Sequence, residues 1–128
     1  MVGYLLSDSG LLIYGDLKHP VHASNLSKTL EKIELNHKNP LTIAIDASLG
    51  SNSKVGKLIV RSGGIIPAMV TEKNLSYVGD ISIVGIVNIS SELSGECSLA
   101  VLSSTRLWLV MQMAEVIAQG IRIYKEDI

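Results

Sequence analysis

The stretch Ile81-Ser-Ile-Val-Gly-Ile-Val-Asn-Ile89 decides the fold class, because it is the clearest β-strand in this chain of 128 residues. Its residues are almost all apolar and many are β-branched, which is typical of a strand buried on both faces of a sheet. The apolar runs Leu11–Tyr14 and Leu41–Ile45 and the β-branched stretch Val55–Arg61 predict three further strands. The chain is therefore expected to be built around a sheet.

Two segments have the apolar spacing of helices that cover such a sheet. The stretch His22–His37 places apolar residues at helical spacing and its Lys and Glu residues between them. A second helix is predicted from the N-cap candidates Ser103 and Ser104 to Gln119, where Gly120 suits a helix stop. This second helix is apolar nearly all round, with Leu107, Val110, Ala114 and Ile117 on one face, so a neighbouring subunit is a candidate to cover the rest.

The order of these elements favours an α/β fold. Continuously apolar strands that alternate with helices predict a three-layer α/β/α sandwich around a mostly parallel sheet, as one domain over residues 1–128. In such sheets, functional residues gather at the carboxyl ends of the strands.

Composition argues against several classes of protein. The chain has 11 Lys and Arg against 12 Asp and Glu, with a formal net charge of −1, so nucleic-acid binding is not expected. Its single cysteine, Cys97, excludes an internal disulfide, and the compartment is expected to be the cytoplasm. The most apolar segment, Leu107–Ala118, falls short of the roughly 20 residues that a membrane-spanning helix needs, so no membrane insertion is expected.

Asp46 is the main candidate for a catalytic residue. It directly follows the predicted strand Leu41–Ile45 and precedes a stretch, Ala47–Lys54, whose Gly and Ser residues predict a loop. A carboxyl group at that edge of a sheet is partly desolvated, which suits general acid or base catalysis. The structural alternative is that Asp46 accepts hydrogen bonds from the backbone amides that follow it.

Hydrolysis by carboxylates normally needs two of them. Asp16 follows the strand predicted at Leu11 and is the candidate partner of Asp46. Asp80 precedes the strand Ile81–Ile89, so a parallel sheet would place it at the opposite edge, as an anchor for a turn. His19 and His22 lack a third ligand, so no metal is expected, and no motif indicates a cofactor.

Three stretches together resemble a family of sporulation proteins of spore-forming Firmicutes. They are Asp16–Leu26, Ile43–Gly56 with its Ile-Ala-Ile-Asp-Ala segment, and Val78–Asn88 with its Val-Gly-Asp-Ile-Ser-Ile segment. The helical stretch Thr105–Ala118 fits the C-terminal segment of that family. The family is related to the germination protease that degrades small acid-soluble spore proteins, and more distantly to hydrogenase maturation endopeptidases.

The resemblance implies a phosphorylase/hydrolase-like sandwich and a pair of catalytic aspartates. Asp46 matches the second of these aspartates, in its Ile-Asp-Ala segment. The first strand of the family, its loop and the first aspartate have no counterpart in this chain, so the domain is expected to be truncated at its N-terminus relative to the family. A forespore location would follow from the same resemblance.

Three hypotheses of function remain. The first is a sporulation-associated, germination-protease-like protein that is inactive or impaired as a peptidase. The second is an active aspartate-type endopeptidase that acts on spore proteins with Asp46 and Asp16. The third is a non-enzymatic, homo-oligomeric interaction module whose unpaired strand edges and exposed helix faces mediate assembly.

Overall fold

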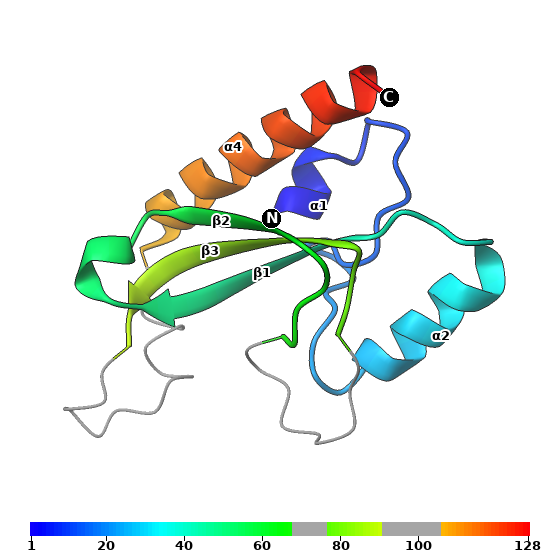
Figure 1. Ribbon diagram of the computed structural model, residues 1–128, viewed down its shortest axis with the longest axis horizontal. Coiled ribbons are helices and arrows are strands. Elements are labelled where there is room, and N and C mark those ends of the chain that lie inside the picture. Colours follow the sequence, from blue (N-terminus) through cyan, green and yellow to red (C-terminus); the bar gives the residue numbers. More distant parts are fainter. Residues whose placement is uncertain (68–76, 91–105) are drawn as a thin grey trace. The chain divides into compact units, whose positions relative to one another are not determined.

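The computed structural model describes residues 1–67, 77–90 and 106–128 (Figure 1). The described elements are α1 (Val2–Leu5), α2 (Leu26–Asn36), β1 (Ile43–Gly50), the single 3-10 turn η1 (Asn52–Lys54), β2 (Leu58–Ser62), β3 (Ile81–Ile89) and α4 (Leu107–Glu126). The chain divides into two compact units, one of Met1–Lys38 with Met111–Ile128 and the other of Asn39–Val110. The fold is mixed α/β, and the sheet belongs to the second unit.

Within residues 1–67, 77–90 and 106–128, the sheet has three strands in the order β1-β3-β2. β1 runs parallel to β3, with Ile43 opposite Ile81, whereas β2 is antiparallel to β3. The prediction of a mostly parallel sheet is therefore wrong, and the sheet is mixed. The reason is the short connection between β1 and β2, because a return to the parallel direction needs a crossover of about a dozen residues or more.

β3 is the central strand and has the predicted bounds, Ile81–Ile89. Ile83, Ile86 and Val87 are buried, as expected for a strand with a neighbour on each side. The outer strands are less buried, and Val60 of β2 is 66% exposed. Burial on both faces is therefore a property of β3 and not of every strand.

β1 is longer than predicted. It continues past Asp46 to Gly50, so half of the predicted loop Ala47–Lys54 is strand. The cause is the neighbouring strand, since β1 pairs with β3 from Ile43 opposite Ile81 to Gly50 opposite Ile89, with one register shift after Ser48. A paired neighbour satisfies the backbone groups of the Gly- and Ser-rich stretch, which composition alone does not reveal.

β2 begins at Leu58, three residues after the predicted start at Val55. Gly56 has a φ of +84°, a left-handed conformation that extended strands do not contain. The Gly56 N–H donates to the Ile86 carbonyl at 2.8 Å, so the turn before β2 is tied to β3.

The run Leu11–Tyr14 does not form a strand, and this prediction is wrong. The Leu11 N–H donates to the Ser9 hydroxyl oxygen at 3.3 Å, and Leu12 is 69% exposed. An apolar run becomes a strand only where another strand pairs with it, and none in the part of the chain that the structure describes does so here.

The first predicted long helix begins later than its pattern indicates. The His22 carbonyl accepts the N–H groups of Asn25 and Leu26 at 3.1 and 3.0 Å, which makes a turn, and α2 proper starts at Leu26. Leu26 is buried, whereas Leu35 near the other end is 87% exposed. The Lys and Glu residues of this helix are exposed, as predicted.

α4 continues through Gly120 to Glu126, so the predicted stop is wrong. Gly120 is not among the glycines with positive φ, and Ile121 directly after it is buried. Burial of this last part outweighs the cost of about 1 kcal/mol for a glycine inside a helix. Ala114 and Ile117 are buried as predicted, but Leu107 is 64% exposed. The proposed N-caps Ser103 and Ser104 lie outside the described residues.

None of the helices in residues 1–67, 77–90 and 106–128 has the length and apolar character needed to cross a membrane.

Candidate functional site around Asp46

Asp46 lies in the middle of β1 and not at its end. The Thr42 carbonyl, just before β1, accepts the N–H of Ile81 at 3.2 Å, and the Gly50 carbonyl accepts the N–H of Ser90 at 2.8 Å. Backbone direction alternates along a strand, so the even-numbered residues of β1 direct their N–H and C=O groups toward β3. The odd-numbered residues direct theirs toward the outer edge of the sheet.

The Asp46 carboxylate accepts the N–H of Ala47 at 2.9 Å. That N–H is one of the outward-directed groups of β1. The Ser48 hydroxyl donates to the Leu49 carbonyl at 3.3 Å, which is another outward-directed group. Two side chains of β1 therefore bind the outer backbone edge of their own strand. The structural alternative for Asp46 is confirmed for the Ala47 amide, although the setting is a strand and not a loop.

Asp80 lies at the opposite end of the parallel pair. Its carboxylate accepts the N–H of Thr42 at 2.8 Å, and its own N–H donates to the Thr42 carbonyl at 2.7 Å. Asp80 thus anchors the start of β1 to the start of β3, whereas the sequence predicted an anchor for a turn.

Asp46 and Asp80 are the acidic residues in the described part of Asn39–Val110. Asp46 is opposite Val84, four residues beyond Asp80, which corresponds to about 13 Å along a strand at ~3.3 Å per residue. These two carboxyl groups are too far apart to share a proton or to act on one bond.

The other predicted partner, Asp16, belongs to the first compact unit. Its carboxylate accepts the N–H groups of Lys18 and His19 at 2.8 and 2.6 Å. The hydrogen bond from the His19 amide is the main cause that lowers the pKa of Asp16 below its ordinary value. Asp16 is therefore an ionised carboxylate that closes a turn, and its pairing with Asp46 remains a prediction.

The two histidines considered as ligands have other contacts. The His22 ring is 2.7 Å from the Ser24 hydroxyl and 3.3 Å from the Asn25 side-chain amide. The Nδ1 atom of His19 is 3.5 Å from the Asp16 carboxylate. Among the residues that the structure describes, no group of three or more His, Cys, Asp or Glu is placed to hold a metal ion. Cys97 lies outside these residues.

A β-bulge lies two residues beyond Asp46, between Ser48 and Leu49. There Val87 is the extra residue of β3, because Ser48 is opposite Ile86 and Leu49 is opposite Asn88. Bulges are frequent beside functional sites, where they redirect side chains and end the pairing of strands. The bulge therefore marks the carboxyl end of β1 as the part of this sheet with irregular geometry.

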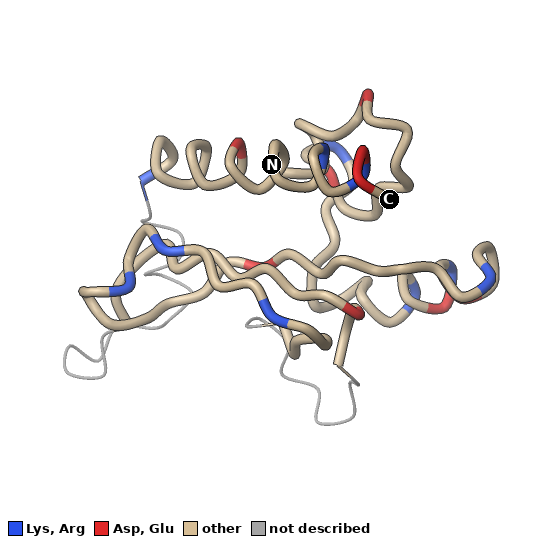
Figure 2. Tube along the Cα trace, turned by 45° about the horizontal axis from the view of Figure 1, so that its top comes forward, with Lys and Arg blue, Asp and Glu red and all other residues tan. Residues whose placement is uncertain are grey.

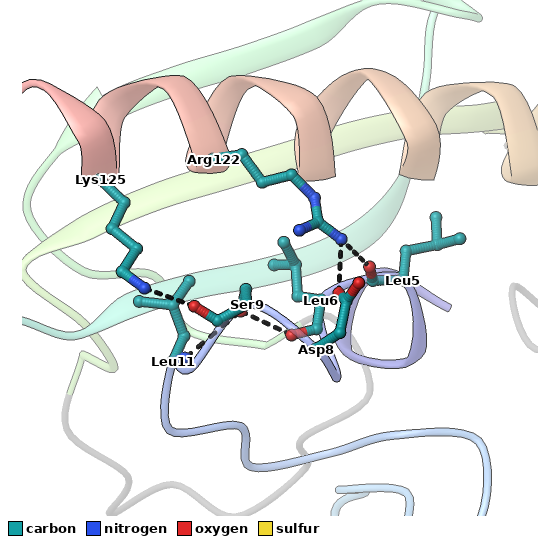
Figure 3. Close-up of polar contacts among 7 residues, drawn as sticks. All are labelled: Leu5, Leu6, Asp8, Ser9, Leu11, Arg122 and Lys125. Carbon is teal, nitrogen blue, oxygen red and sulfur yellow. Dashed lines mark hydrogen bonds and ion pairs between the residues drawn. The ribbon is translucent and has the colours of Figure 1, made fainter.

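A polar cluster that no sequence pattern indicated lies between α4 and the N-terminal segment (Figure 3). The Arg122 guanidinium donates to the Leu5 carbonyl and to the Asp8 carboxylate, both at 2.7 Å. The Lys125 ammonium donates to the Ser9 carbonyl. The helix predicted from the sequence ended at Gly120 and therefore did not include Arg122 or Lys125. For this reason the sequence did not indicate the cluster.

A shallow groove of about 280 Å³ lies beside this cluster, within the same compact unit. It is lined by Leu5, Glu115, Ala118, Gln119 and Arg122. Figure 2 shows that Lys and Arg are interspersed with Asp and Glu along the described chain, without a long stretch of one sign.

Comparison with known proteins assigns the chain to a family. The family model described as "Protein of unknown function (DUF1256)" matches residues 1–120. The chain belongs to the DUF1256 family. It is 43% identical over 111 residues to the "Uncharacterized protein YyaC" of Bacillus subtilis (strain 168), in an alignment that covers 87% of this chain and 52% of that protein. The chain thus spans about half the length of the curated relative that it matches. No solved structure matches.

The DUF1256 match includes Asp16, Asp46 and Asp80 and ends two residues before Arg122. Within the described sheet of this DUF1256 chain, Asp46 is a single carboxylate on the strand edge, and Asp80 is a structural anchor.

Proposed function

We propose that this chain is a sporulation-associated, germination-protease-like protein that is inactive as a peptidase in this form. In this proposal its fold is a phosphorylase/hydrolase-like α/β/α sandwich, Asp46 is the remaining acid of an ancestral pair, and the protein works in the cytoplasm of the forespore. The mixed sheet with parallel β1 and β3 and the long helix α4 are compatible with that fold. The similarity of the Ile-Asp-Ala segment around Asp46 to the germination protease supports the assignment.

The separation of Asp46 and Asp80 carries the proposal of inactivity. Acid–base hydrolysis by carboxylates pairs a protonated group with an ionised one at close range. The backbone positions of Asp46 and Asp80, the acidic residues of the described sheet unit, are about 13 Å apart along the strands, from four residues at ~3.3 Å each. Asp80 is moreover engaged with both backbone groups of Thr42.

The alternative is an active endopeptidase in which Asp16 is the second acid. The lowered pKa of Asp16, caused chiefly by the His19 amide, makes it the ionised member of such a pair. The cleavage assay separates this active pair from inactivity.

The test is an assay for cleavage with matched variants. The purified protein is incubated with unfolded casein and with a small acid-soluble spore protein, and the products are measured by mass spectrometry. Wild type, Asp46→Asn, Asp16→Asn and Asp80→Asn are compared, and circular dichroism checks that each is folded. We expect no cleavage above the buffer control for any of them. Cleavage by the wild type that Asp46→Asn abolishes would overturn the proposal, and equal loss in Asp16→Asn would establish the active pair.

A further inference from the structure

The segment Met1–Gly10, which we call the strap, belongs to the same compact unit as α4 from Met111 onward. Its backbone hydrogen bonds are local, because the N–H groups of Leu5, Leu6, Ser7 and Ser9 donate to carbonyls of the strap itself at 3.0 to 3.2 Å. Within residues 1–67, 77–90 and 106–128, no backbone–backbone hydrogen bond joins the strap to another segment. Side chains therefore fasten the strap to the rest of its unit.

Two cations of α4 make these contacts (Figure 3). The Arg122 guanidinium donates to the Leu5 carbonyl and to the Asp8 carboxylate, both at 2.7 Å. The Lys125 ammonium donates to the Ser9 carbonyl. Residues three positions apart lie on the same side of a helix, so both cations act on the strap from one face of α4.

Apolar side chains lie beside these polar contacts. Leu6 of the strap is 3% exposed, and Ala118 and Ile121 of α4 are 5% and 7% exposed. Leu5 and Ala118 line the same shallow groove, so the strap borders α4 one turn before Arg122. Movement of the strap away from α4 would therefore uncover Ala118 and widen the groove.

The polar contacts are exposed to water. The Arg122 side chain is 40% exposed and the Asp8 side chain is 78% exposed. Exposed ion pairs contribute little to stability and are screened by salt. A segment with local backbone hydrogen bonds and few outside contacts opens more easily than a core strand. β3, by contrast, is hydrogen-bonded along its length to β1 and β2.

We propose that the strap opens from α4 as one unit while the remaining structure stays folded, and that Arg122 and Lys125 control how often it opens. The open form exposes Ala118 and the floor of the groove, so the strap regulates access to this face of α4. High ionic strength and loss of the Arg122 guanidinium both favour the open form. This inference does not depend on the proposed function, because it concerns the first compact unit and not peptidase activity.

Amide hydrogen exchange followed by NMR tests the opening. In the wild type, the Leu6 amide should exchange at least about tenfold faster than the Ile86 amide of β3, relative to intrinsic rates. Its rate should also depend less on urea, because opening of the strap exposes less surface than unfolding. Arg122→Gln should accelerate Leu6 exchange by about tenfold, since hydrogen bonds from a charged group are lost.

The control for this experiment is Arg61→Gln, which removes a positive charge from an exposed position of β2. It should leave Leu6 exchange unchanged. Equal rates and equal urea dependence for the Leu6 and Ile86 amides would show that the strap opens only when the protein unfolds. Leu6 exchange that does not respond to Arg122→Gln would show that Arg122 does not fasten the strap. Either result would overturn the inference.

Thiol labelling tests access to α4 in a second way. With Cys97 replaced by Ser, Ala118→Cys places a thiol at a groove position that is 5% exposed, and Ser82→Cys places one at a position of β3 that is 1% exposed. N-ethylmaleimide, which is uncharged, should label Ala118→Cys at least about tenfold faster than Ser82→Cys, since the first needs only opening of the strap. Equal rates would contradict the proposal.

Salt identifies the contact that controls the opening. Raising the salt concentration should accelerate the labelling of Ala118→Cys several-fold, because it screens the attraction between Arg122 and Asp8. In an Arg122→Gln background, labelling should already be fast and should respond less to salt. The same salt effect in both backgrounds would show that the Arg122 contact does not hold the strap closed.

Discussion

The carboxylate of Asp80 lies 2.8 Å from the backbone N–H of Thr42, and the Thr42 carbonyl in turn accepts the Asp80 N–H at 2.7 Å. These two residues directly precede β3 and β1, respectively, and are 38 positions apart in the sequence. Their two hydrogen bonds hold the first residues of both strands side by side, so the parallel register begins with Ile43 opposite Ile81. An acidic residue that precedes a strand serves here as a structural anchor.

Replacing Asp80 should weaken this anchor. We expect Asp80→Ala to lower the free energy of unfolding by about 1–2 kcal/mol, because the hydrogen bond to the Thr42 N–H is lost. Chemical denaturation measures the effect. Glu34→Ala, at an exposed position of α2, is the control and should change stability by less than about 0.5 kcal/mol. Equal effects of the two substitutions would show that the Asp80 contact contributes nothing specific.

Gly79 should not tolerate a side chain. It has a φ of +94°, and a Cβ atom there would lie 2.8 Å from the Cβ of Ala44. Both the left-handed backbone and the close contact oppose Gly79→Ala, which we expect to destabilise the protein by about 3 kcal/mol. Thermal and chemical denaturation measure the loss. A variant as stable as the wild type would contradict this geometry.

Gly120 should respond in the opposite direction to the same substitution. It lies inside α4, and a Cβ atom there would have no neighbour within 4 Å. Because alanine loses less conformational entropy than glycine in a helix, Gly120→Ala should stabilise the protein by about 0.5–1 kcal/mol. A loss of stability would indicate that α4 ends at Gly120, as its sequence pattern first indicated.

The contact between Asp8 and Arg122 should make stability depend on pH. The hydrogen bond from Arg122, and then its charge, lower the pKa of Asp8 in the folded state. A lowered folded pKa stabilises the protein above the unfolded pKa of about 3.9, and this contribution is lost as pH falls through the folded pKa. The difference in stability between wild type and Asp8→Asn should therefore shrink below about pH 4. In an Arg122→Gln background, Asp8→Asn should have little effect at any pH.

Two neighbouring residues of α4 should differ sharply in their tolerance of alanine. Ile117 is 7% exposed and Val116 is 59% exposed. We expect Ile117→Ala to cost about 2–4 kcal/mol, because it leaves a cavity and removes buried apolar surface. Val116→Ala should stay within about 0.5 kcal/mol of the wild type. If urea denaturation gave similar losses of stability for Ile117→Ala and Val116→Ala, the face of α4 that carries Val116 would be covered in solution.

The sequence predicted the central strand, α2 and α4 because their patterns are strong and local. The bounds of β3 were predicted without error, since a nine-residue stretch with six Ile or Val residues has few other stable conformations. The position of Asp80 as an anchor was also predicted, because it required only the parallel direction of β1 and β3. The errors lie where a neighbour decides the conformation.

Asp46 remains the predicted site residue, but its position inside a strand was not predicted. Asp46 was recognised from its place after an apolar run, but the continuation of β1 to Gly50 depends on the pairing with β3. The cluster of Arg122 with Asp8 joins residues 114 positions apart, and no local pattern indicates such a contact. Hydrogen bonds between distant segments follow from packing, which composition and periodicity do not specify.

By itself, the sequence determined that this is an α/β chain with a buried strand at Ile81–Ile89 and amphipathic or apolar helices. These properties depend on side chains at neighbouring positions, so a local pattern is enough to predict them. The tertiary structure alone decided that Leu11–Tyr14 is not a strand, that Asp46 lies within β1 and that its carboxylate binds the strand edge. The physical reason is that a strand exists only with a hydrogen-bonded neighbour, and that neighbour is supplied by a distant part of the chain.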